Sequence, residues 1–113
     1  MKKATVKRLE GAGWVVGNAS KFVGLSMVEE ALVEIRLALG DEVRESRKRA
    51  NLTQVDLAKR LGSSQSRVAK VETGDTTVSI DLQVKALLAA GSKPGAVFSA
   101  LARRLSRRAQ KAA

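Results

Sequence analysis

The middle of the sequence contains an alanine, a glycine and two valines at intervals that strongly restrict how it folds. Ala58 lies four residues after Gln54, where two crossing helices leave room only for a methyl group. Gly62 follows four residues later, at a turn where a residue without Cβ tolerates positive φ. Val68 and Val71 come six and nine residues after Gly62 and fill the space behind a second short helix. The spacing predicts two short helices that cross at a tight turn, which is a helix-turn-helix; an ordinary helical hairpin is the alternative.

The helices of this region are bounded by polar N-caps and by glycines. We expect Thr53 to cap a helix that runs through Leu61 and that Gly62 ends, a second helix from Gln65 to Glu72, and a turn at Thr73-Gly74-Asp75. Ser79 is expected to cap a third helix, which runs to Ala90 and whose core candidates are Leu82, Ala86, Leu87 and Leu88. Ser92 suits the N-cap and Pro94 an early position of a last helix that ends near Ala109.

A longer helix is predicted before the motif, from Met27 to about Arg49. Ser26 and Glu29 match a capping box at its start, after a shorter helix that Gly24 ends, and Gly40 is a place where the long helix bends or breaks. Apolar residues recur along it at intervals of three and four and share one face: Val28, Leu32, Ile35, Leu39 and Val43. This stripe is either core within the chain or the seam of a dimer.

Composition excludes several classes of function. With no Cys and no His among 113 residues, the chain lacks thiol chemistry, disulfides, His-based catalytic triads and the usual ligands of transition metals, so we expect no cofactor and no enzyme activity. Aromatic residues make up only 3%, so the core must be aliphatic. No apolar run approaches the ~20 residues of a membrane span. The formal net charge of +10 points first to nucleic acid, and a merely solvated surface is the alternative.

The stretch from Leu52 to Val68, continuing to Glu72-Thr73-Gly74, closely resembles the lambda repressor/Cro (Xre) family of helix-turn-helix proteins. The resemblance covers about Val43 to Leu101 and implies a five-helix bundle whose third helix, the recognition helix, enters the major groove of DNA. Gly13-Trp14 and the stretch Phe22-Val23-Gly24-Leu25-Ser26 are in addition similar to the HigA-like antitoxins, which pair with toxins that cleave messenger RNA on the ribosome.

The resemblance also implies which residues contact DNA. Gln54 is expected to touch a phosphate at the start of the first motif helix, where free N–H groups favour an anion. The recognition helix reaches base edges with its first residues: Gln65 can bond adenine at two points, and Arg67 can reach guanine or phosphate. The full set of expected DNA-binding residues is Gln54, Lys59, Arg60, Ser64, Gln65, Ser66, Arg67, Lys70 and Thr73. For Lys59 and Arg60, a solvated helix face is the alternative.

Three other features bear on this interpretation. Arg47 and Glu72 match a partly buried ion pair of the family, with a structural role. Asp75 departs from the family, because repressors often carry basic residues after the recognition helix. Residues 44–70 nevertheless hold eight Lys+Arg against two acidic residues, so the local field still attracts DNA. The C-terminal end carries five cations and forms a basic amphipathic helix that docks on the domain or a partner, grips phosphate, or binds an anionic membrane.

The sequence thus predicts an all-α protein with a lambda-repressor-like five-helix domain. We expect a helical N-terminal extension over 1–40, the DNA-binding domain over 41–101 and a basic C-terminal tail over 102–113. The leading hypothesis is a repressor in the bacterial cytoplasm that binds a palindromic operator in double-stranded DNA as a homodimer. In that hypothesis it is the antitoxin of a type II toxin–antitoxin operon. Its protein partner is then a cognate toxin, and it does not bind a membrane. The alternatives are a phage-type repressor, a restriction–modification controller, or an adaptor that uses the domain for protein contacts.

Overall fold

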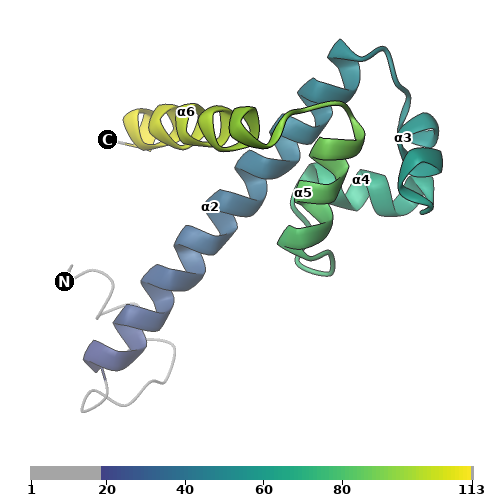
Figure 1. Cartoon of the computed structure of the whole chain (residues 1–113). Coiled ribbons are helices and arrows are strands. Elements are labelled where there is room, and N and C mark those ends of the chain that lie inside the picture. The colour runs from purple at the N-terminus through teal and green to yellow at the C-terminus, as the bar shows by residue number, and fades with distance from the viewer. Residues whose placement is uncertain (1–18, 113) are drawn as a thin grey trace. The chain divides into compact units, whose positions relative to one another are not determined.

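A computed structural model of the chain describes residues 19–112 (Figure 1). That part of the chain is all-helical and contains no strand, as predicted. By internal contacts the chain divides into Met1–Val33 and Glu34–Ala113, and the core and the candidate site belong to the second unit. The predicted features before residue 19, including Gly13-Trp14, lie outside the described residues. The helices are α2 (Ala19–Arg49), α3 (Gln54–Leu61), α4 (Gln65–Thr73), α5 (Ile80–Ala89) and α6 (Pro94–Ala112).

Local hydrogen bonds fix the two ends of α3. The Thr53 hydroxyl accepts from the N–H of Asp56 at 3.0 Å, and the Asp56 carboxylate accepts from the N–H of Thr53 at 2.9 Å. This reciprocal capping box satisfies two N–H groups that the helix itself leaves unpaired. At the other end Gly62 has φ +63°, the left-handed conformation in which a side chain would be strained. The predicted N-cap and C-terminal glycine of α3 are therefore confirmed.

The later helices follow the same rules with one correction. The Ser64 hydroxyl accepts from the N–H of Arg67 at 3.2 Å and caps α4, while Ser79 caps α5 in the same way at 3.0 Å. Pro94 is the first residue of α6, as expected. The prediction that Ser92 caps α6 is wrong, because its hydroxyl lies 3.1 Å from the hydroxyl of Ser46 on α2 instead.

Helix α2 starts earlier than predicted and is continuous. Gly24 and Ser26 both lie inside it, so Gly24 does not end a helix and Ser26 is not an N-cap. There is no break at Gly40 either. A glycine inside a helix costs only about 1 kcal/mol, which neighbouring helical residues readily offset. Gly40 instead serves packing, since a Cβ atom there would stand 2.5 Å from the carbonyl oxygen of Glu72 at the C-terminal end of α4.

The core is small and aliphatic, as the composition predicted. The apolar stripe of α2 is buried where it meets the other helices, with Leu39 and Val43 at most 1% exposed, whereas Val28 is 64% exposed. Leu88 is 43% exposed, so its prediction as a core residue is wrong; it lies one position beyond the buried Ala86 and Leu87 on α5. The most deeply buried apolar side chains are Ala38, Leu39, Val43, Leu57, Val68, Val71, Ala86 and Leu87.

A polar side chain, Gln83, occupies the centre of this core. It is fully buried on α5, and its amide nitrogen donates to the carbonyl oxygens of Arg36 at 2.9 Å and Val71 at 3.1 Å. The Arg36 guanidinium in turn donates to the carbonyl oxygen of Val78, which is in the loop between α4 and α5. The bonds of Gln83 join the end of α4 to α2, and Gly40 lets the backbones of these two helices approach closely. Helix α4 is therefore held at its C-terminal end.

Candidate nucleic-acid interface

The N-terminal end of α4 is the exposed part of the motif. Val68 and Val71 face the core, whereas Gln65, Ser66 and Arg67 are exposed to solvent. Lys70 lies one turn further along α4 and is exposed as well. The α4 residues expected to reach base edges are thus free to enter a groove while the opposite face anchors the helix.

A chain of side-chain hydrogen bonds connects this exposed end to the interior. Gln65 donates from its amide nitrogen to the amide oxygen of Gln54 at 3.2 Å, and Gln54 donates to a carboxylate oxygen of Glu72, also at 3.2 Å. The two glutamines come from different helices, α4 and α3, which the tight turn brings side by side. Because Gln54 is oriented from both sides, the first turns of α3 and α4 present their polar groups in a fixed relation to each other.

Glu72 is the buried end of this chain and is held by arginines from α2. Arg47 donates to its two carboxylate oxygens at 2.6 and 3.1 Å, and the Arg44 guanidinium lies 3.5 Å away. Burial by itself raises the pKa of Glu72, but the hydrogen bonds from Arg47 and Gln54 and the positive charge of Arg47 together outweigh it. The pKa of Glu72 therefore lies below its usual value. Glu72 is an anion that ties α2, α3 and α4 together.

Three other predicted DNA-binding residues lie at the C-terminal ends of the two motif helices: Lys59 and Arg60 on α3, and Thr73 on α4. The Arg60 guanidinium donates to the carbonyl oxygen of Ala89 at 3.0 Å, which satisfies the C-terminal end of α5. Lys59 is exposed in the last turn of α3. Thr73 is exposed, and its hydroxyl donates to the carbonyl oxygen of Lys70 at 3.1 Å. Arg60 and Thr73 thus have bonds within the chain, and Ser64 is engaged as the α4 cap.

Asp75, the residue that departs from the family, has a structural partner. One carboxylate oxygen accepts from both the N–H and the hydroxyl of Thr77, at 2.7 and 2.6 Å. These bonds lower the pKa of Asp75 and fold the loop after α4 back on itself. A shallow depression of about 280 Å³ lies beside this loop, lined among others by Ser66, Arg67 and Lys70. The cations of α4 therefore border a hollow on the same surface.

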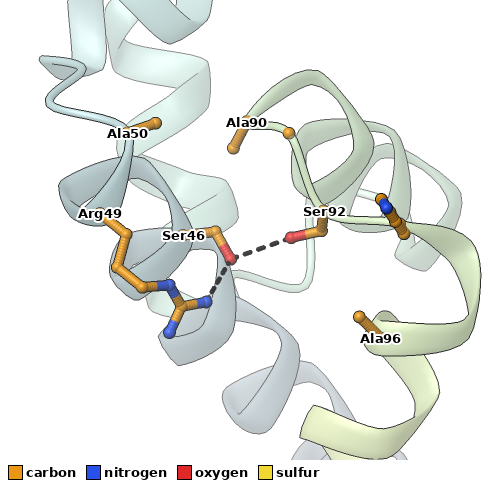
Figure 2. A pocket seen from close by; sticks show the side chains of 8 residues that line it. Ser46, Arg49, Ala50, Ala90, Ser92 and Ala96 are labelled. Carbon is orange, nitrogen blue, oxygen red and sulfur yellow. Dashed lines mark hydrogen bonds between the residues drawn. The ribbon is translucent and has the colours of Figure 1, made fainter.

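A larger hollow lies elsewhere, where the end of α2 meets the link between α5 and α6 (Figure 2). It measures about 410 Å³ and is lined mostly by small residues, together with Arg49 and Lys93. Figure 2 shows Ser46 at its wall, bonded both to Ser92 and to Arg49, each at 3.1 Å. None of the predicted DNA-binding residues lines it.

Sequence reasoning missed Gln83, and it missed the capping role of Ser64, which it had placed among the DNA-binding residues. A glutamine is usually exposed, and the burial of Gln83 is explained by the bonds that its amide nitrogen donates to the carbonyl oxygens of Arg36 and Val71. The role of Ser64 as the cap of α4 was available from the sequence, since serine directly before a helix is a common cap. Because Ser64 caps α4, its side chain is fixed at the N-terminal end of that helix, next to the residues that are expected to contact DNA.

The fold and this exposed helix define the class of protein, which is an all-helical DNA-binding protein built on a helix-turn-helix. A family model described as a helix-turn-helix domain matches residues 38–101, more than half of the chain. The chain belongs to this helix-turn-helix family. No curated protein and no solved structure matches it. Over the described residues, no helix is long and apolar enough to cross a membrane.

Proposed function

We propose that the protein is a sequence-specific transcriptional repressor of the Xre type, acts in the cytoplasm and has no catalytic activity. The observation that carries the proposal is the anchored but exposed start of α4. Gln65 there is oriented by Gln54, which the buried Glu72 fixes in turn. A side-chain amide held in this way pays less ordering entropy when it bonds an adenine at two points.

The repressor is proposed to bind as a symmetric homodimer. One recognition helix reads only a few base pairs, whereas specific binding typically exceeds non-specific binding by a factor of about 10³ or more. A two-fold dimer doubles the number of bases read and places its recognition helices about 34 Å apart on a palindrome. Phe98 on α6 is 72% exposed, which makes this helix the favoured contact between the two copies.

The experiment that tests this proposal is the selection of bound duplexes from a random pool by the full-length protein. We expect a palindrome whose half-sites are one helical turn apart. Gln65→Ala should then weaken binding to the selected operator by about 1–3 kcal/mol, roughly 5- to 150-fold, and hardly change binding to random duplex. Lys59→Ala serves as the contrast, because loss of a phosphate contact weakens binding to every sequence. An equal loss on both duplexes for Gln65→Ala would remove its reading role.

We further propose that the repressor is the antitoxin of a type II toxin–antitoxin operon, regulates its own promoter and neutralises a cognate toxin. Besides the resemblance to HigA-like antitoxins, the exposed apolar side chains of α2 support this role. Met27 is 57% exposed, Val28 64% and Val33 46%, and a partner protein would cover such residues. Co-expression with the adjacent gene tests the proposal by growth and pull-down. A neighbour that neither arrests growth alone nor binds this chain would refute the antitoxin role.

A further inference from the structure

Helix α6 separates its positive charges onto two faces. Between Arg103 and Lys111 it carries five cations, and no acidic residue follows Asp81 in the sequence. Two of these cations have carboxylate partners on α2, and three have no ion pair or hydrogen bond to any residue that the structure describes. The two groups therefore serve different purposes.

The paired cations attach α6 to α2. Arg104 lies 2.8 Å from a carboxylate oxygen of Glu42, which is 6% exposed. Arg108 reaches Asp41 at 3.3 Å and Glu34 at 3.5 Å. Both arginines therefore connect α6 with the part of α2 from Glu34 onward. On the same side of α6, Val97 and Ala100 are buried, at 3% and 7% exposure.

The unpaired cations form a row along another face of α6. Arg103, Arg107 and Lys111 are exposed and follow one another at intervals of four residues. With a rise of about 1.5 Å per residue, neighbouring charges in the row are about 6 Å apart along the helix axis. A shallow depression of about 510 Å³ is lined by Arg103 and Arg107, and its remaining lining is small or polar: Ala102, Ser106 and Gln110. We refer to Arg103, Arg107 and Lys111 as the α6 row.

The chemistry of the α6 row fits an extended polyanion. Like charges four residues apart on a helix repel each other, so a row without acidic neighbours is stabilised by anions that lie along it. Serine and glutamine between the cations add donors for phosphate oxygens. Insertion into a membrane would need the apolar stripe of an amphipathic helix, Val97, Leu101 and Leu105. Val97 is already buried, and Leu101 and Leu105 are half-buried.

We propose that the α6 row binds the phosphate backbone of duplex DNA without regard to sequence and adds a second contact surface to that of α4. The inference rests on the proposed function in so far as both concern the same duplex. Its role is distinct, because the row contributes affinity and salt dependence, whereas the start of α4 contributes the choice of sequence.

The test compares two triple variants of the full-length protein that lose the same charge, from +10 to +7. The row variant is R103Q/R107Q/K111Q. The matched control is K48Q/K85Q/K93Q, which removes three exposed lysines from α2, α5 and the residue before α6. Binding to the selected operator and to random duplex is measured by fluorescence anisotropy across a salt series, and circular dichroism checks that both variants remain helical.

The row variant should lower the steepness of log K against log salt by about 2.7, which corresponds to three phosphate contacts. It should also weaken binding to the operator and to random duplex by the same factor, with a clearly smaller effect in the control. If the wild type chooses an operator but both variants behave alike, the α6 row is refuted and the repressor stands. If the wild type binds all duplexes equally while the row variant still loses steepness, the sequence-specific function fails and the α6 row stands.

Two further outcomes would overturn the proposal. If the wild-type protein binds no duplex at all, both the proposed DNA contact of the α6 row and the proposed repressor function are refuted. Co-sedimentation with vesicles of phosphatidylserine and phosphatidylcholine examines a lipid surface directly. If the row variant loses vesicle binding but keeps the wild-type salt dependence on DNA, the row is a membrane surface.

Discussion

Replacement of Glu72 by alanine tests the buried anion that connects three helices. The Glu72 side chain is fully buried, and Arg47 opposite it is only 13% exposed. Glu72→Ala leaves the Arg47 guanidinium largely without water and without its carboxylate partner. Arg47 keeps one bond, to the carbonyl oxygen of Leu52 at 2.9 Å. The substitution also removes the acceptor that orients Gln54.

Removal of one member of a buried ion pair typically costs about 3–5 kcal/mol. Because Arg47 keeps its bond to Leu52 and Arg44 loses only a long contact of 3.5 Å, we expect the lower end, about 3 kcal/mol. For a domain of this size each kcal/mol lowers the melting temperature by about 4–8 °C. The expected decrease is therefore about 12–24 °C.

Chemical denaturation followed by circular dichroism measures the effect, and the chain offers a matched control. Asp81 and Lys85 on α5 form an ion pair at 3.2 Å whose side chains are 79% and 65% exposed. Asp81→Ala should cost less than about 1 kcal/mol, because water screens this pair. A Glu72→Ala protein that is as stable as the Asp81→Ala protein would show that the buried pair contributes nothing, and the reasoning would be refuted.

Two more perturbations follow, one from the packing of α2 against α4 and one from the buried glutamates Glu42 and Glu72. Gly40→Ala should destabilise by about 1–3 kcal/mol, because the new Cβ meets the carbonyl oxygen of Glu72 at 2.5 Å. Gly24→Ala in the same helix meets no atom within 4 Å and should stabilise by roughly 0.5–1 kcal/mol, so melting temperatures that shift alike would contradict the close approach. Glu42 and Glu72 both have pKa values lowered in the folded state: burial raises them, but hydrogen bonds from Arg104 and Arg49, and from Arg47 and Gln54, outweigh it. Their stabilisation is present above the unfolded pKa of about 4.3 and is lost as the pH falls through the folded values, so Glu72→Gln should flatten the pH dependence of unfolding in acid, and an unchanged profile would count against this coupling.

The sequence predicted much of the fold because helix ends are decided by neighbours in the chain. Thr53, Gly62 and Ser79 act within three or four residues of their own positions, through backbone hydrogen bonds that any copy of the same local sequence would make. The same locality explains the failure at Ser26, where a capping pattern lies within a helix that had already begun. A capping pattern shows that a residue could cap a helix, but it does not show that a helix begins there.

The candidate DNA-binding residues follow from the resemblance to the lambda repressor/Cro family and stay a prediction. The resemblance left open how each of these side chains is used within the fold. Arg60 bonds to the end of α5 and Ser64 to the start of α4, while Gln65, Ser66 and Arg67 are exposed at the start of α4. The bond of Arg60 depends on a residue far away in the sequence, and the bond of Ser64 depends on the geometry of the helix cap.

By itself, the sequence determined the helical class, the aliphatic core and the position of the turn, since these follow from composition and from periodicity along one segment. Only the tertiary structure decided which polar groups are buried and which charges are neutralised. Gln83 is buried because two carbonyl groups from α2 and α4 face it, and Arg104 is paired because Glu42 lies opposite it on a helix far away in the sequence. The physical reason is that a hydrogen bond or an ion pair forms only between groups a few ångströms apart. The folded arrangement of the helices, and not the separation of residues in the chain, therefore determines which polar groups pair.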